Sequence, residues 1–248
     1  MIRPPPRSTL SPSSAASDVY KRQKSYHSRR KLESTPTTEE FSPKTLKFIT
    51  THAIFESLCD FVKEGVINGI CIIAGCSLEN SGEKLLLLLK NLLGKGFLIL
   101  VYGCISYSIA EKFAELFEKW TSMSSEGVQK VCRELDISPV IIGGSCFDVS
   151  RCIELIAEIR GGTPVGKDFP IILLLPNYAN DVMFTIAITG AIAGAMTIIA
   201  DMRRIAGGRA YLKCLSDEIS KLGGGVLHFA PGIDKALDGV DKYLEQVQ

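Results

Sequence analysis

Short apolar runs alternate with amphipathic stretches along the chain from about residue 52 onward. Before that point, residues 24–51 are polar and rich in hydroxyl and charged side chains, which indicates a linker or an exposed arm. The apolar runs are Ile70–Ala74, Phe97–Val101, Val140–Ile142, Ile171–Leu175, Met196–Ile199 and Gly225–Phe229. Runs this short and this apolar are typical of strands that are buried on both faces of a sheet.

Helical spacing of apolar residues marks the stretches around these runs. They are Ala53–Lys63, Gly82–Leu93, Ser108–Trp120, Ser125–Leu135, Asp148–Arg160, Asn180–Ala193, Ala210–Leu222 and Ile233–Gln246. Regular alternation of such strands and helices indicates a parallel sheet with helices on both faces. The sequence therefore predicts an α/β, Rossmann-like three-layer domain over residues 52–248, with a mostly parallel sheet of about six strands.

One apolar segment needs a membrane test. Val182–Ala200 contains 19 uncharged residues, which reaches the length needed to span a bilayer. The β-branched cluster near its end favours a strand, however, and the segment lies within the regular alternation of strands and helices. We expect a buried helix that ends near Gly194, then a strand over Met196–Ala200, and no membrane span.

Composition narrows the functional classes. The net charge is +1, so nothing favours nucleic acid or an anionic membrane as a partner. The first 23 residues are polar and do not resemble a secretory signal. Eight cysteines in 248 residues are too sparse for a small disulfide scaffold. We therefore expect a cytoplasmic protein whose cysteines fill the core, bind metal or act as nucleophiles.

Three cysteines come directly after predicted strands, and glycine precedes each within two positions. They are Cys76, Cys104 and Cys146. Right-handed crossovers bring the carboxyl ends of parallel strands to one edge of a sheet, where ligands of such folds bind. A helix follows each cysteine, and a helix N-terminus favours the thiolate form. Three converging thiolates would form half of a soft-metal or iron–sulfur site.

The alternative is that these cysteines fill the core, as buried cysteines often do. Core filling is the better interpretation for five others, which lie within predicted helices or strands: Cys59, Cys71, Cys132, Cys152 and Cys214. His228 ends the last predicted strand and is a weaker ligand candidate. The chain has no C-x-x-C zinc spacing and no glycine-rich nucleotide-binding motif, so neither function has a positive signal.

Residues 1–23 have an unusual ending. Asp18–Gln23, DVYKRQ, resembles the translation of an adapter that sequencing kits attach to DNA fragments. We expect residues 1–23 to be an artefact without ordered structure, and the native chain to extend further upstream. The alternative is a native disordered tail rich in serine and proline.

The three cysteine motifs also resemble a known family. They read AGCSLEN (Ala74–Asn80), VYGCISYSIAEKF (Val101–Phe113) and GGSCFDVSR (Gly143–Arg151), and LPNYANDVMFTIAITGAIAG (Leu175–Gly194) follows them. In order and approximate spacing they resemble the C-terminal domain of the anaerobic nickel–iron–sulfur carbon monoxide dehydrogenases, over about residues 52–248. The related hybrid cluster (prismane) proteins share the three-cysteine layout, but their third motif is closer to G-Q-C-N-D.

This resemblance implies a fragment of a redox metalloenzyme that interconverts CO and CO₂ with two electrons. Cys76, Cys104 and Cys146 would be three thiolate ligands of its nickel–iron–sulfur cluster. A histidine and two further cysteines would come from an upstream domain or a partner chain. The resemblance also implies a ferredoxin-like electron carrier and a possible homodimer.

Two departures from the family pattern put activity in doubt. The family's catalytic lysine aligns with Val182, and an asparagine of its third motif aligns with Val149. Valine can neither donate a hydrogen bond nor carry charge, so we expect no catalytic residue in this chain. The alternatives are a divergent iron–sulfur-cluster-binding or structural protein without CO activity, or a reductase like the hybrid cluster proteins.

Overall fold

The computed structural model describes residues 52–76, 82–113, 117–144, 148–162, 169–177, 181–201 and 208–247. All of these residues lie in one compact unit, Phe41–Gln248. The predictions for residues 1–23 and 24–51 fall outside the described residues.

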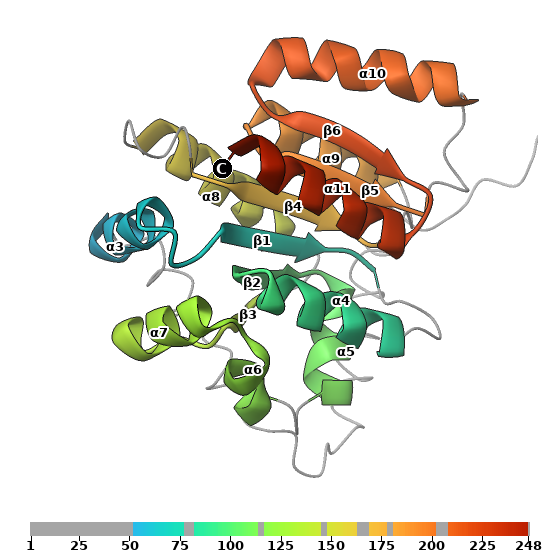
Figure 1. The fold of residues 1–248 in the computed structure, drawn as a ribbon. Helices are drawn as coiled ribbons and strands as arrows, with labels where there is room; N and C mark the ends of the chain where they lie inside the picture. The colour runs from blue at the N-terminus through green and yellow to red at the C-terminus, as the bar shows by residue number, and fades with distance from the viewer. Residues whose placement is uncertain are drawn as a thin grey trace, which may run out of the picture. The chain divides into compact units, whose positions relative to one another are not determined.

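Six parallel strands form a single sheet, which Figure 1 shows from one face. They are β1 (Gly69–Ala74), β2 (Phe97–Tyr102), β3 (Val140–Gly144), β4 (Ile171–Leu175), β5 (Met196–Ala200) and β6 (Val226–Ala230). Their order across the sheet is β3-β2-β1-β4-β5-β6, and every neighbouring pair is parallel. The predicted α/β fold and the number of strands are confirmed.

Nine helices lie within the described residues. They are α3 (His52–Lys63), α4 (Gly82–Gly94), α5 (Cys104–Phe113), α6 (Phe117–Met123), α7 (Glu126–Leu135), α8 (Val149–Gly162), α9 (Asp181–Ile192), α10 (Gly208–Gly223) and α11 (Ile233–Val247). The predicted helix Ser108–Trp120 is wrong in its bounds, because α5 already begins at Cys104 and α6 is separate. Gly103 has a φ of +86°, which turns the chain at once from β2 into α5.

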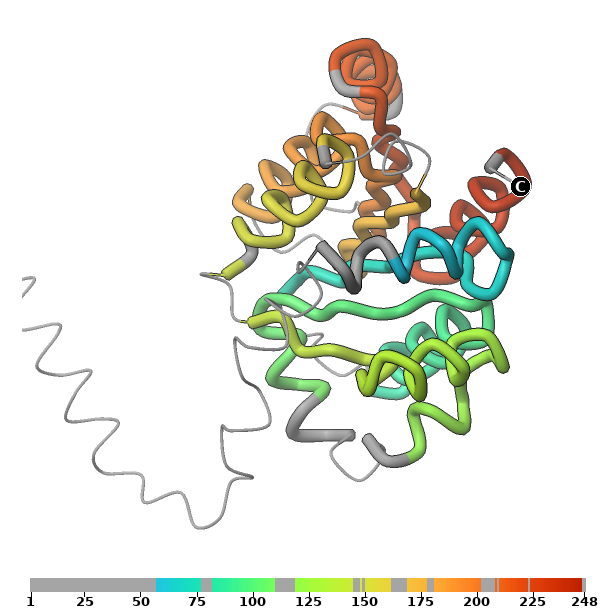
Figure 2. The backbone as a smooth tube through the Cα atoms, turned by 90° about the vertical axis from the view of Figure 1, so that its left-hand side faces the viewer, coloured from blue at the N-terminus to red at the C-terminus, as the bar shows by residue number. Residues whose placement is uncertain are grey.

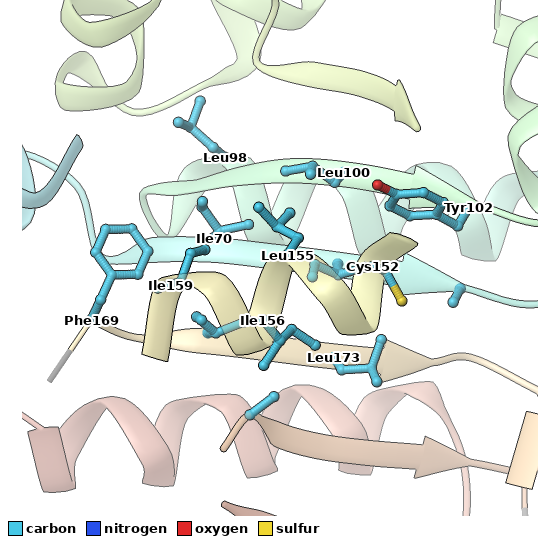
Figure 3. Close-up of a cluster of buried hydrophobic side chains, with 14 of the residues drawn as sticks. Ile70, Leu98, Leu100, Tyr102, Cys152, Leu155, Ile156, Ile159, Phe169 and Leu173 are labelled. Atoms are coloured by element: carbon cyan, nitrogen blue, oxygen red, sulfur yellow. The ribbon is translucent and has the colours of Figure 1, made fainter. Parts of the chain in front are cut away.

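Each strand divides its side chains between two buried layers. On β2, Leu98, Leu100 and Tyr102 face a cluster that includes α8 and α9. Figure 3 shows part of this cluster, in which Tyr102 lies near Cys152 of α8. Phe97, Ile99 and Val101 face a second cluster that includes α4, α5 and α11. Figure 2 shows α8 and α9 on the opposite side of the sheet from α11. Burial on both faces explains why β1, β2, β4 and β5 are almost entirely apolar, whereas the edge strand β6 has two exposed positions, Val226 and His228.

The long apolar segment folds as predicted into a helix and a strand. It forms α9 and β5, which are separated by a turn at Gly194 with a φ of +104°. Within the described residues, no helix combines the length and the apolar character needed to cross a bilayer. Helix α9 is apolar around most of its circumference because it packs against the sheet and both neighbouring helices, α8 and α10.

The strand order reverses between β1 and β4. Connections from β1 run to β2 and β3 on one side, and the chain then crosses back to β4 on the other. In α/β sheets of this kind, ligands bind at the carboxyl ends of the strands beside such a reversal. The residues that follow β1, β2 and β4 are therefore the first to consider for a site.

Candidate metal centre

Cys76 and Cys104 follow neighbouring strands at the same edge of the sheet. β1 and β2 pair in register up to Ala74 and Tyr102, each two residues before its cysteine. Cys76 is partly buried, whereas Cys104 is exposed and is the first residue of α5. The dipole of a helix favours an anionic side chain at this end. The structure thus brings two of the three predicted ligands to one edge.

The turns that carry these two cysteines are hydrogen-bonded to each other through Gly75. Its N–H donates to the carbonyl oxygen of Tyr102 at 3.2 Å, and its carbonyl oxygen accepts from the N–H of Ile105 at 3.2 Å. A Cβ atom at Gly103 would lie 2.5 Å from the Gly75 oxygen. This close approach and the positive φ of Gly103 leave room only for glycine.

The end of β3 is joined to the same group of turns. The N–H of Gly103 donates to the Gly144 oxygen at 3.0 Å. The buried hydroxyl of Ser106 lies 2.6 Å from the Gly103 oxygen and 3.1 Å from the Gly144 oxygen, so it can donate to either. Cys146 lies outside the described residues, but Gly144, two positions before it, is fixed beside the turn that carries Cys104.

Tyr102 supports the glycine pair that precedes Cys146. A Cβ atom at Gly143 would lie 2.4 Å from Cζ of the Tyr102 ring, so the ring packs directly against the backbone there. The ring is fully buried, and its hydroxyl has no hydrogen-bond partner among the described residues. Burial, followed by the nearby Cys152 thiol, raises the pKa of Tyr102. Tyr102 therefore stays neutral and acts as a packed support.

Asp148 closes over Gly144 from the start of the next helix. A Cβ atom at Gly144, whose φ is +144°, would lie 2.7 Å from Oδ2 of Asp148. The Asp148 carboxylate also forms an ion pair with Arg151 at 3.8 Å. The segment that leads to Cys146 is thus held on both sides in the described part of the chain.

The remaining cysteines differ from this set in burial. Cys59, Cys71, Cys132 and Cys152 are buried. Burial raises the pKa of the Cys132 thiol to about 11 and that of the Cys152 thiol to about 12, so both stay protonated. Core filling is confirmed for these four residues. It is wrong for Cys214, which is exposed on α10 because its helix lies at the end of the sheet and packs with its other face.

His228 does not join the cysteines. It lies on β6, which is three strands away from β1 in the sheet. A Cβ atom at Gly239 of α11 would lie 3.2 Å from Cδ2 of the His228 ring, so the ring packs on that helix.

The sequence analysis did not identify Ser106, whose hydroxyl links the turns after β2 and β3 by hydrogen bonds. Its only sequence signal is a serine two positions after Cys104.

The arrangement fits one side of a metal site that uses thiolate ligands. Among the residues that the structure describes, no three His, Cys, Asp or Glu side chains gather closely enough to hold a metal ion, and Cys146 is not among those residues. The glycines before the two cysteines allow the turns that carry them to pack closely together at adjacent strand ends. Thiolates bind soft metal ions and iron–sulfur clusters.

Val182 lies at the same edge of the sheet, beyond β4. It is the second residue of α9, and 61% of the residue's surface is exposed. The structure therefore places an uncharged, exposed side chain where the sequence comparison aligned a lysine.

Comparisons with known proteins show the family and the fold of the chain. The sequence model of the Prismane/CO dehydrogenase family matches residues 10–234, and so begins before residue 52, where we expected the resemblance to start. Carbon monoxide dehydrogenase 2 of Methanosarcina mazei is 26% identical over 196 residues, which cover 76% of this chain and 30% of that protein.

Solved structures show the same fold at low sequence identity. Carbon monoxide dehydrogenase from Thermococcus sp. AM4 superposes with a TM-score of 0.70 at 21% identity, covering 82% of this chain and 33% of that one. Carbon Monoxide Dehydrogenase IV from Carboxydothermus hydrogenoformans gives a TM-score of 0.70 at 22% identity, covering 82% of this chain and 34% of that one. The chain spans about a third of the length of these relatives. Since the family match extends over most of its sequence, the chain belongs to the Prismane/CO dehydrogenase family.

Proposed function

We propose that this chain supplies three thiolate ligands, Cys76, Cys104 and Cys146, to a nickel–iron–sulfur cluster in a carbon monoxide dehydrogenase-like redox enzyme. When bound, the cluster supplies the redox chemistry that converts CO and H₂O to CO₂, two protons and two electrons. An upstream domain or a partner chain completes the ligand set, and a ferredoxin-like carrier exchanges the electrons. In this proposal the enzyme works in the cytoplasm, and its assembled form is a homodimer.

The proposal depends chiefly on one observation. Cys76 and Cys104 follow adjacent strands, and the backbone of Gly75 joins their turns by two hydrogen bonds of 3.2 Å. Core-filling cysteines need no such arrangement, and the four buried cysteines in the described residues do not have it. Family membership adds that proteins of this sequence type include carbon monoxide dehydrogenases.

In this proposal the residues of this chain hold and orient the cluster, and none of them takes part in the reaction itself. The N-terminus of α5 favours the Cys104 thiolate. Gly75, Gly103 and Gly144 let the turns that lead to the cysteines pack closely against neighbouring atoms of the protein, while Ser106 fixes the spacing of two turns. These interactions preorganise one half of the ligand set before a metal binds.

Metal analysis of the anaerobically purified protein, together with the domain that completes the site, tests this proposal. We expect nickel and iron in the wild type, and loss of most of both in Cys76→Ser and Cys104→Ser. Cys214→Ser is the matched control, since Cys214 is exposed but lies on α10. If the wild-type protein contained neither nickel nor iron, the proposed ligand role would be excluded and only a structural role would remain for this domain.

A second candidate is a cluster-binding protein without CO activity, and Val182 favours it. A transition state that gains negative charge would lack the cationic donor that a lysine provides. CO-dependent reduction of a viologen dye separates the two functions. If the missing lysine is the cause of inactivity, Val182→Lys raises the rate about 100-fold, whereas Thr185→Lys, one turn along α9 and also exposed, does not.

A further inference from the structure

Asn177 lies directly across the reversal of strand order from Cys76. β1 and β4 are neighbours, and their last paired residues are Ile73 and Leu174. Cys76 and Asn177 each lie three residues beyond that pair. A Cβ atom at Gly75, the residue before Cys76, would lie 3.1 Å from Oδ1 of Asn177. The amide of Asn177 thus faces the turn that carries the candidate ligand.

The Asn177 amide is also incompletely paired in the chain alone. Its Oδ1 atom is buried and has no hydrogen-bond partner among the described residues. A buried polar atom without a partner destabilises the folded state. A half-turn of the amide exchanges Oδ1 and Nδ2 with little change in shape, so either polar end can face the turn. With Nδ2 turned toward the turn, a bound group that accepts a hydrogen bond at this edge would supply the missing partner.

Thiolates and sulfides are acceptors, and an amide N–H is the complementary donor. Hydrogen bonds to the sulfurs of a metal site orient the ligands and tune the reduction potential. We propose that Asn177 is a positioning residue, whose side-chain N–H donates to the sulfur that Cys76 brings to the metal. This inference rests on the proposed function, because it requires Cys76 to be a ligand.

Thr197 provides a matched control. Its side chain is fully buried in β5, and its Oγ1 atom also has no hydrogen-bond partner among the described residues. It lies within the sheet beside Gly190 of α9, away from the cysteine turns. Thr197→Val and Asn177→Leu both remove an unpaired buried polar group, but only Asn177→Leu removes the proposed donor.

The test uses the full chain together with the domain that completes the site, under anaerobic conditions, with Co²⁺ as the probe, whose thiolate charge-transfer band reports on sulfur ligands. We expect both substitutions to raise the melting temperature of the metal-free chain, by about 2–4 °C. Only Asn177→Leu weakens Co²⁺ binding, by about tenfold, and moves the band to lower energy, since a thiolate without the hydrogen bond donates its electrons more readily.

The outcomes separate this inference from the proposed function. A lower melting temperature for metal-free Asn177→Leu would mean that the amide is structural, and would overturn the inference. So would Co²⁺ binding of unchanged affinity and spectrum in that variant. If Cys76→Ser leaves the wild-type Co²⁺ band unchanged, or if no band forms even with the domain that completes the site present, Cys76 is not a ligand. The proposed function then fails, and the inference fails with it.

Discussion

Gly103 lies where the turns of Cys76 and Cys104 meet, and its lack of a side chain allows the contact. The space for a Cβ atom is occupied by the Gly75 oxygen at 2.5 Å. Gly75 in turn is bonded on both sides, to Tyr102 and to Ile105. A shift of either turn would therefore move one cysteine relative to the other, so a single residue determines the spacing of two candidate ligands.

We expect Gly103→Ala to be much more destabilising than Gly65→Ala. Both glycines have positive φ, +86° and +69°, which costs alanine about 1–2 kcal/mol. Gly65 has no atom within 4 Å of its would-be Cβ, whereas Gly103 has the Gly75 oxygen, which adds about 1–3 kcal/mol. Urea unfolding of both variants measures the difference, and equal losses would contradict the tight packing described.

His228 gives the molecule a predictable response to acid. Burial, followed by the positive charge of Lys242, lowers the pKa of His228 below its ordinary value near 6.5. As the pH falls through this value, the unfolded chain takes up a proton that the folded chain resists. The contribution of His228 therefore makes the folded state less stable below about pH 6.5, until the folded-state pKa is reached.

Replacing His228 should reduce this loss. We expect the urea midpoint of His228→Gln to fall less than that of the wild type between pH 8 and pH 5. Lys242→Gln should have a smaller effect in the same direction, because burial is the larger cause of the shift. An unchanged pH dependence in His228→Gln would show that other groups dominate.

At the scale of elements, α9 packs on β4 through a missing side chain. A Cβ atom at Gly190 would lie 2.3 Å from Cδ2 of Leu173. The helix can approach the sheet this closely only because glycine occupies that position. Val182 is the second residue of the same helix. The packing of Gly190 against Leu173 therefore also determines how close Val182 lies to the sheet.

Alanine substitutions in two neighbouring helices should therefore have opposite effects. We expect Gly190→Ala to destabilise the fold by about 1–3 kcal/mol through overpacking. Gly161 lies near the end of α8 with no atom within 4 Å of its would-be Cβ. Gly161→Ala should be neutral or stabilising by about 0.4–1 kcal/mol, because it restricts the unfolded chain. Thermal unfolding measures both, and a stable Gly190→Ala would mean that α9 can shift outward.

The elements that could be predicted from the sequence are those with a local cause. All six strands were predicted, because burial makes each of them a short run that is mainly apolar, although the edge strand β6 includes the exposed His228. The end of β3 was missed, since Gly143 and Gly144 read as a turn while they continue the strand. The start of α5 was also missed, since Ser106 and Ser108 resemble residues that precede a helix. In the structure both lie in its first turns, where Ser108 donates to the Cys104 oxygen and Ser106 to the oxygen of Gly103, just before the helix.

The candidate site was predictable only in part, because some of its features have no local cause in the sequence. Cysteines after strands are visible in the sequence, and the order of strands brings Cys76 and Cys104 to one edge. The role of Asn177 depends on the pairing of β1 with β4, whose sequences are far apart, and nothing local to either strand specifies it. Cys146 stays a prediction, because it lies outside the described residues.

At the scale of the whole molecule, the candidate site is one-sided. The ligand candidates all follow β1, β2 and β3, which form one half of the sheet. A set of three thiolates is open on its other side, and metal sites need a full ligand set. The rest of the set would have to come from outside the described fold.

We therefore expect this chain by itself to fold but to hold no intact nickel cluster. Anaerobic reconstitution with iron, sulfide and nickel, followed by gel filtration and metal analysis, tests this. Sub-stoichiometric nickel that is lost on gel filtration is the expected result. Stoichiometric nickel in a cluster that survives the column would mean that the three cysteines suffice.

The central position of β1 in the sheet also has a consequence for folding during synthesis. β1 leaves the ribosome before the other strands, yet it lies between β2 and β4 in the finished sheet. Until β4 is synthesised, one edge of β1 lacks a pairing partner, and an unpaired strand edge promotes aggregation. The cysteine turns after β1 and β2 can already meet during that interval. A nascent chain thus presents adjacent thiols beside an unpaired strand, which makes a reducing environment and fast completion of the sheet important for productive folding.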